Sequence, residues 1–157
     1  EIDMYSREMS LYADVPSLAV AENIAEEAKR YCGIDGTSWL EEIERLRNAG
    51  VYRQKETVEV QYFAIGRWCI CGVPYELMVE FALEAMAKLK NQFFYVNGYT
   101  NGCLSYFPTE DEYDIGGYEV YWSILIYYKY FNRVFPFERD SASKLIEFII
   151  GNAPITE

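Results

Sequence analysis

The sequence predicts a mixed α/β protein, with α+β as the alternative class. Apolar residues recur every three or four positions within residues 14–50, which is typical of amphipathic helices. They recur at every second position over residues 57–65, which is typical of a half-buried strand. A helical segment then separates two short strand-like segments, and that order indicates a parallel crossover. We therefore expect a helical hairpin followed by a mixed β-sheet with a crossover helix.

The helical hairpin is expected within residues 14–50. Asp14 is the predicted N-cap of the first helix, with Pro16 in its first turn and Gly33 just past its end. The second helix is expected to begin at Ser38, whose hydroxyl can cap the backbone, and to stop at Gly50. The predicted buried positions are Leu18, Ala21, Ala25, Ala28 and Tyr31 in the first helix and Trp39, Ile43 and Leu46 in the second.

The sheet is expected within residues 57–151. Segments 57–65 and 68–71 are predicted to form a β-hairpin, with Gly66 at the first central position of its turn. Pro74 is expected to open a helix that runs to about Lys90. Residues 93–96 then predict a short buried strand, and a second short run follows at 103–107. Thr109 is expected to cap a short turn, and the last helix runs from Asp140 or Ser141 to Ile150.

Composition excludes several classes of function. The chain has 157 residues, with 25 Asp and Glu against 14 Lys and Arg, and a net charge of −11. This acidic balance disfavours nucleic acids and anionic membrane surfaces as partners. No apolar run approaches the roughly 20 residues of a transmembrane segment. The chain has no His, so neither an imidazole metal ligand nor a Ser-His or Cys-His pair exists within it.

The length suits a single domain, or a C-terminal fragment of a larger one. Because the chain begins at Glu1 with no signal segment, we expect an excised or processed piece. Its cysteines are Cys32, Cys69, Cys71 and Cys103, which we expect to be reduced and to bind no structural metal. Cys69 and Cys71 share one face of a predicted strand, so a thiolate zinc site is the alternative. The sequence does not identify the cellular compartment, although reduced cysteines favour the cytoplasm.

Glu76 is the first candidate functional residue. It follows directly on a predicted strand, and in open α/β sheets ligands gather beyond the carboxyl ends of the strands. The first turn of the expected helix would favour its ionised form through unpaired N–H groups and the helix dipole. The structural alternative is a glutamate that only complements that dipole.

A set of short motifs extends this interpretation. The motifs are Gly72-Val73-Pro74-Tyr75-Glu76, Gly98-Tyr99-Thr100-Asn101, Tyr106-Phe107-Pro108-Thr109, Glu112-Tyr113 and Gly116-Gly117-Tyr118-Glu119-Val120. Together they resemble the later part of the catalytic region of the neutral/alkaline, non-lysosomal ceramidase family, in its bacterial branch. The resemblance covers most of the chain and is most specific from Val58 to Val120.

The resemblance implies a zinc-dependent amidohydrolase of sphingolipid metabolism, which cleaves N-acylsphingosines or a related N-acyl amide. By alignment, the family's metal-binding Glu falls on Glu76 and its metal-binding Tyr on Tyr106, which is also the implied catalytic residue. Asn101, Tyr118 and Glu119 become the implied substrate-binding residues. The two His ligands of the family have no counterpart here. Glu76 and Tyr106 are therefore expected to face one polar cleft as part of a larger catalytic domain.

The sequence also differs from the resembled family at three positions near the proposed site. Tyr75 replaces the family's Gly beside the metal-binding Glu, and Cys103 and Ser105 differ in the following loop. The remaining zinc ligands are expected in a missing N-terminal half or a second chain, so this chain alone is expected to be inactive. An exposed apolar surface and a homo-oligomer are also expected. The alternative is a non-catalytic ceramidase-like homologue that binds a ligand or partner; a weaker one is a carbohydrate- or lipid-binding module on residues 118–137.

Overall fold

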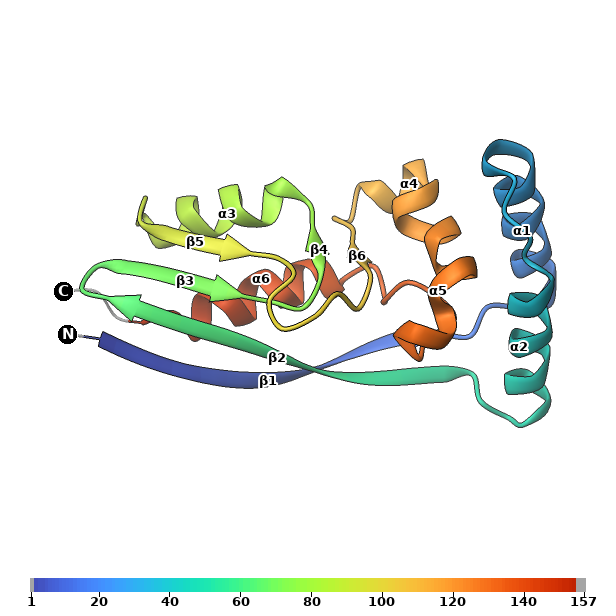
Figure 1. The fold of residues 1–157 in the computed structure, drawn as a ribbon, viewed down its shortest axis with the longest axis horizontal. Coiled ribbons are helices and arrows are strands. Elements are labelled where there is room, and N and C mark those ends of the chain that lie inside the picture. Colours follow the sequence, from blue (N-terminus) through green and yellow to red (C-terminus); the bar gives the residue numbers. More distant parts are fainter. Residues whose placement is uncertain (1, 155–157) are drawn as a thin grey trace.

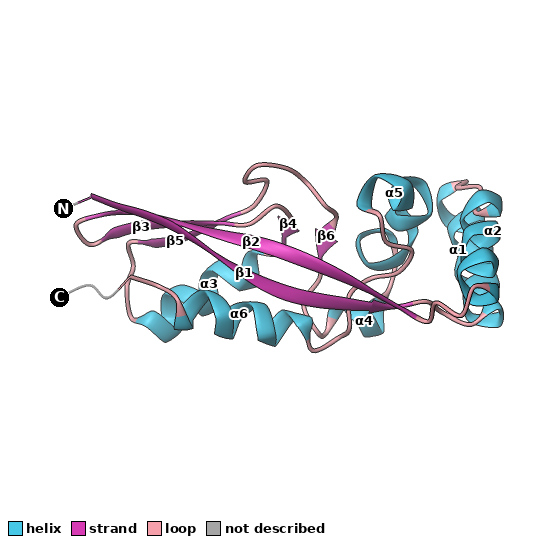
Figure 2. Ribbon diagram, turned by 90° about the horizontal axis from the view of Figure 1, so that it is seen from below, coloured by secondary structure: helices cyan, strands magenta, loops and turns pink. Residues whose placement is uncertain are grey.

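The computed structural model describes residues 2–154 and confirms a mixed α/β fold. A four-stranded sheet with the order β1-β2-β3-β5 forms the long body of the molecule (Figure 1). Helices α3 and α6 lie along one side of this sheet, and the pair α1 and α2 stands at the far end of the strands β1 and β2 (Figure 2). A separate two-stranded sheet, β4-β6, lies between these regions.

The strands β1 (Ile2–Asp14) and β2 (Arg53–Ile65) form a long antiparallel ribbon. They pair along their whole length, from Ile2 opposite Ile65 to Asp14 opposite Arg53. The sequence analysis did not predict β1, because within this strand only Leu11 and Ala13 are buried. A strand with so few buried positions lacks the alternation by which a strand is recognised.

The ribbon carries the predicted helical hairpin, α1 (Leu18–Cys32) and α2 (Thr37–Asn48). The N-cap of α1 is Ser17, whose hydroxyl accepts a hydrogen bond from the Val20 N–H, and not Asp14, which ends β1. Before α2, the carboxylate of Asp35 accepts hydrogen bonds from Thr37, and Ser38 plays no capping role. Trp39, Ile43 and Leu46 are buried as predicted, whereas Leu18 and Tyr31 are exposed.

The predicted β-hairpin and parallel crossover are both present. Strand β3 (Trp68–Gly72) pairs antiparallel with β2 across the Gly66 turn, where Gly66 has a φ of +57°. Helix α3 (Val79–Leu89) then leads to β5 (Phe94–Asn97), which pairs parallel with β3. Strand β5 lies at the edge of the sheet, so only Phe94 among its residues is fully buried.

The helix expected from Pro74 begins five residues later. Residues Glu76–Leu77 form strand β4, which pairs parallel with β6 (Tyr106–Phe107). The carbonyl of Pro74 accepts a hydrogen bond from the Leu104 N–H at 2.7 Å, and the Glu76 N–H donates to the Ser105 carbonyl at 3.0 Å. These long-range bonds hold the segment extended and override the preference of proline for a first helical turn. Glu76 therefore lies in a strand and not at a helix start.

Four helical segments remain in the described chain, and two of them, α5 and α6, help to close two separate apolar cores. The four segments are α4 (Glu112–Ile115), the π-helical turn η1 (Tyr118–Trp122), α5 (Ser123–Phe131) and α6 (Ser141–Gly151). One core lies between the sheet and the helices α3 and α6, and includes Tyr62, Phe81 and Leu145. The other joins α5 to the helical hairpin and includes Trp39 and Ile43.

The cysteines are unpaired, and no helix is suited to a membrane span, in the part of the chain that the structure describes. Within residues 2–154 all four cysteines are free, with Cys69 and Cys71 buried on the same face of β3 and Cys32 exposed. Burial raises the pKa of Cys69 to about 11. No helix in this described part of the chain has the length and apolar character that crossing a membrane requires.

Candidate functional site

The site is built where the parallel strands β3 and β5 end side by side. Gly72, at the end of β3, lies opposite Asn97, at the end of β5, so the chain leaves both strands in the same region. The two departing segments, residues 73–76 and 98–105, are joined by backbone hydrogen bonds. The Thr100 N–H donates to the Val73 carbonyl at 3.0 Å, and the Tyr99 N–H donates to the Tyr75 carbonyl at 3.0 Å.

The loop of residues 98–105 is tightly constrained. A Cβ atom on Gly98 would lie 2.5 Å from the carbonyl oxygen of Tyr75, so only glycine permits this approach. Three residues that follow have positive φ angles although they are not glycine: Tyr99 at +54°, Asn101 at +58° and Ser105 at +150°. Such backbone strain is kept only where surrounding contacts impose it, and it is often found at functional sites.

Glu76 and Tyr106 are brought together at this point. They are directly paired across β4 and β6, although 30 positions separate them in the sequence. Both residues line one cavity of about 460 Å³. The other residues that line it are Cys103, Ser105, Tyr118, Ser123, Tyr127, Tyr130 and Phe131. The cavity thus has an acidic and phenolic side on β4 and β6 and an aromatic side on η1 and α5.

The Glu76 carboxylate interacts with two tyrosine hydroxyls. A hydrogen bond to Glu76 is the main cause that raises the pKa of Tyr99 to about 12. Burial raises the pKa of Tyr106, and the negative charge of Glu76 raises it further. Both phenols therefore remain protonated at neutral pH. The sequence analysis did not select Tyr99 as a site residue; its place in the loop directly after a strand was the signal available.

The implied substrate-binding residues lie in different places. Tyr118 lines the cavity, and its ring meets the ring of Tyr106 edge-on with 6.1 Å between their centroids. Glu119 does not line the cavity. The pKa of Tyr106 is raised mainly by burial and by Glu76, and the negative charge of Glu119 makes a smaller contribution in the same direction. Asn101 is exposed in the strained loop and does not line the cavity. Only Tyr118 of these three therefore shares the cavity with Glu76.

The donor atoms of the cavity fit part of a metal site. The Glu76 carboxylate and the Tyr106 hydroxyl are oxygen donors, and the Cys103 thiol lines the same cavity. Among residues 2–154 there is no group of three or more His, Cys, Asp or Glu side chains that could hold a metal ion. Zinc commonly takes nitrogen, sulfur and oxygen ligands in a set of three or four. The described residues therefore provide an incomplete set.

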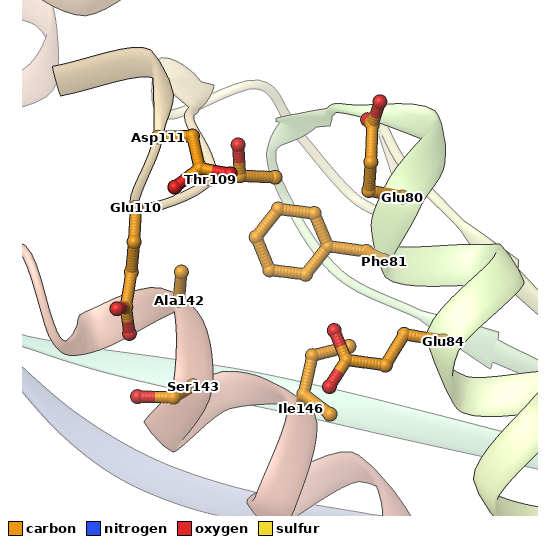
Figure 3. Close-up of a pocket in the computed structure, with 9 residues that line it drawn as sticks. All are labelled: Glu80, Phe81, Glu84, Thr109, Glu110, Asp111, Ala142, Ser143 and Ile146. Atoms are coloured by element: carbon orange, nitrogen blue, oxygen red, sulfur yellow. The ribbon is translucent and has the colours of Figure 1, made fainter. Parts of the chain in front are cut away.

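A second cavity lies between α3, α6 and the turn before α4 (Figure 3). It has a volume of about 380 Å³, and acidic side chains surround the apolar residues Phe81 and Ile146. Its acidic residues are Glu80, Glu84, Glu110 and Asp111. None of the predicted site residues lines it, so it is distinct from the cavity at Glu76.

Comparisons with known proteins add no family or relative to this description. No protein-family model, no curated protein and no solved structure matches the chain.

Proposed function

We propose that this chain is the C-terminal portion of a zinc-dependent, ceramidase-like amidohydrolase that hydrolyses an N-acyl amide. The observation that carries the proposal is the pairing of Glu76 with Tyr106 at one cavity. The ceramidase resemblance assigns these same two residues to one metal. The pairing supports that assignment because two residues 30 positions apart need not share any surface.

Glu76 and Tyr106 would hold the zinc ion together with ligands from outside the chain. When bound, zinc supplies Lewis acidity that polarises a carbonyl group and lowers the pKa of water. Glu76 contributes negative charge to the site. When it carries its proton, the Tyr106 hydroxyl, which lines the cavity, would also donate a hydrogen bond to a substrate oxygen on which negative charge develops.

The aromatic side of the cavity supports a lipid-like substrate. Tyr118, Tyr127 and Phe131 present apolar ring surface next to the Glu76 carboxylate, which suits an amide linked to a hydrocarbon chain. Asn101 and Glu119 remain proposed substrate-binding residues that would act outside the lining of the cavity.

The partner in this proposal is the missing N-terminal half of the polypeptide or a second chain that supplies two His ligands. Two oxygen donors alone bind zinc weakly. The 157-residue chain by itself is therefore expected to be inactive, and neither nucleic acid nor a membrane-spanning segment has a part in the proposal.

The test is Glu76→Gln in the full-length protein, with an N-acylsphingosine as the substrate. The substitution removes the charge of a proposed ligand but keeps its shape. Loss of even an outer contact to a metal ligand costs about 10–100-fold, so hydrolysis should fall by at least about 100-fold, with a parallel loss of bound zinc. Glu80→Gln is the matched control and should change neither, because Glu80 lines the other cavity. Equal activity of the two variants would contradict the proposal.

A binding function without catalysis is the second candidate. It is favoured by the largely aromatic wall of the cavity and by the incomplete ligand set among the described residues. In that case the 157-residue chain alone should bind an N-acyl amide in the presence of a metal chelator, and the full-length protein should release no fatty acid. Zinc-dependent release of the fatty acid would rule this candidate out.

A further inference from the structure

A largely buried ion pair lies next to the two segments that carry the site. The Nε atom of Arg133 is 3.4 Å from a carboxylate oxygen of Glu56, and the Arg133 side chain is only 3% exposed. Arg133 also donates to the Phe135 carbonyl at 2.6 Å and lies over the ring of Phe137, with its Cζ atom 3.9 Å from the ring centroid. Its charge is thus paired and hydrogen-bonded, as a buried guanidinium requires.

This ion pair contacts the residue that precedes each proposed ligand. The Tyr75 hydroxyl donates to Glu56 at 2.6 Å, and Tyr75 is followed by Glu76. An Nη atom of Arg133 donates to the Ser105 hydroxyl at 2.6 Å, and Ser105 is followed by Tyr106. The ion pair therefore links the two chain segments from which Glu76 and Tyr106 project.

Two features indicate that this linkage does more than stabilise the fold. Burial of an ion pair costs desolvation energy, and apolar residues of similar volume often stabilise a fold equally well. In addition, β4 and β6 each contain only two residues, and Ser105 has the unfavourable φ of +150°. Backbone hydrogen bonds hold the two segments extended but do not by themselves fix the orientation of side chains, and the bonds to the Tyr75 and Ser105 hydroxyls add a side-chain constraint next to each proposed ligand.

We infer that Arg133 and Glu56 are positioning residues that hold Glu76 and Tyr106 in register through the hydroxyls of Ser105 and Tyr75. The inference rests on the proposed function, because it assigns these residues to the same site. This inference also assigns a role to Tyr75, which occupies the position where the ceramidase family has glycine. The bulky side chain is turned into the core, where it is fully buried, and its hydroxyl reaches Glu56.

The test removes single hydroxyl groups, because loss of either charge would leave its partner buried and unpaired. In the full-length protein, Tyr75→Phe and Ser105→Ala should each lower kcat and zinc affinity by about 10-fold, the lower range for an outer contact to a metal ligand. KM should stay within about twofold. Tyr5→Phe is the matched control, since it removes a hydroxyl that donates to the Asn152 carbonyl at 2.7 Å on the far part of the sheet, and it should change neither quantity. Variants that melt at lower temperature but keep full kcat and zinc affinity would overturn the inference.

A second measurement separates this inference from the proposed function. In the metal-free 157-residue chain, Tyr75→Phe should shift the NMR signals of the Glu76 amide and the Tyr106 ring, while Tyr5→Phe leaves them unchanged. If the full-length protein has no zinc-dependent hydrolysis but these shifts occur, the proposed function fails and the positioning of the pair stands. If the shifts are absent, the positioning inference fails, whatever the activity.

Discussion

Tyr99 shows how the site changes the chemistry of a single side chain. The residue is 57% exposed, yet a hydrogen bond to Glu76 raises the pKa of its phenol to about 12. Glu76 and Tyr106 were predicted as a pair because the ceramidase resemblance assigns both residues to one metal. Tyr99 was not, because its approach to Glu76 depends on a positive φ angle that sequence spacing does not reveal. For the same reason, no residue pattern indicated that Arg133 and Glu56 would meet across 77 positions.

The Tyr99 phenol provides a prediction at the scale of one residue. Glu76→Gln should lower the pKa of Tyr99 from about 12 toward its ordinary value of 10, because the charged acceptor is lost. NMR of ring-labelled tyrosine, with Tyr99→Phe for assignment, measures this change, and Glu80→Gln serves as the control. Because the folded-state pKa is raised, the interaction stabilises the fold fully below pH 10 and is lost as the pH rises through about 12. An unchanged Tyr99 pKa in Glu76→Gln would refute the contact.

Elements with a strong local pattern were predicted well, and elements held by distant partners were not. The alternation of Val58, Val60 and Tyr62 predicted β2, and all three residues are buried. The start of α3 was misplaced because pairing with residues 104–107 holds Pro74 and its neighbours extended. The aromatic-rich residues 118–137 have no clear helix or strand period; they form the π-helical turn η1, helix α5 and an irregular segment. Tertiary contacts thus decided the elements that build the site.

The junction of the two loops provides a prediction at the scale of elements. Gly98→Ala should lower the free energy of unfolding by about 1–3 kcal/mol, because its methyl group would meet the backbone oxygen of Tyr75 at 2.5 Å. Gly151→Ala is the control. Nothing lies within 4 Å of a Cβ at that position, and alanine favours the helix by up to about 1 kcal/mol. Urea denaturation of both variants measures the difference, and equal stability would show that the loops do not approach each other as described.

At the scale of the molecule, helices cover one face of the four-stranded sheet and leave apolar side chains exposed on the other. Met4, Phe63, Ile70 and Tyr95 form one row across all four strands, and Ile2, Ile65 and Trp68 form the next row. All seven side chains are exposed, with fractions from 39% for Phe63 to 76% for Met4. Figure 2 shows α3 and α6 together on the opposite side of the sheet. The expected exposed apolar surface is therefore present in this chain.

This surface should make the isolated chain bind hydrophobic dyes, because contiguous exposed apolar patches are uncommon on soluble monomers. Ile70→Lys, at the centre of the first row, should reduce dye fluorescence and any self-association seen in sedimentation. The free energy of unfolding should change by no more than about 0.5 kcal/mol, because the side chain is half exposed. Ile115→Lys, on an exposed position of α4, is the control and should have little effect. A wild-type chain that binds no dye would contradict the exposure of this face.

We propose that Glu76 and Tyr106 bind one zinc ion. The most direct test is a crystal structure of the zinc-loaded full-length protein, with the metal located by its anomalous diffraction. We expect one zinc with a carboxylate oxygen of Glu76 and the hydroxyl oxygen of Tyr106 each about 2 Å away, completed by ligands from outside this chain. A zinc bound elsewhere, or Glu76 and Tyr106 oxygens more than about 5 Å apart in that structure, would contradict it.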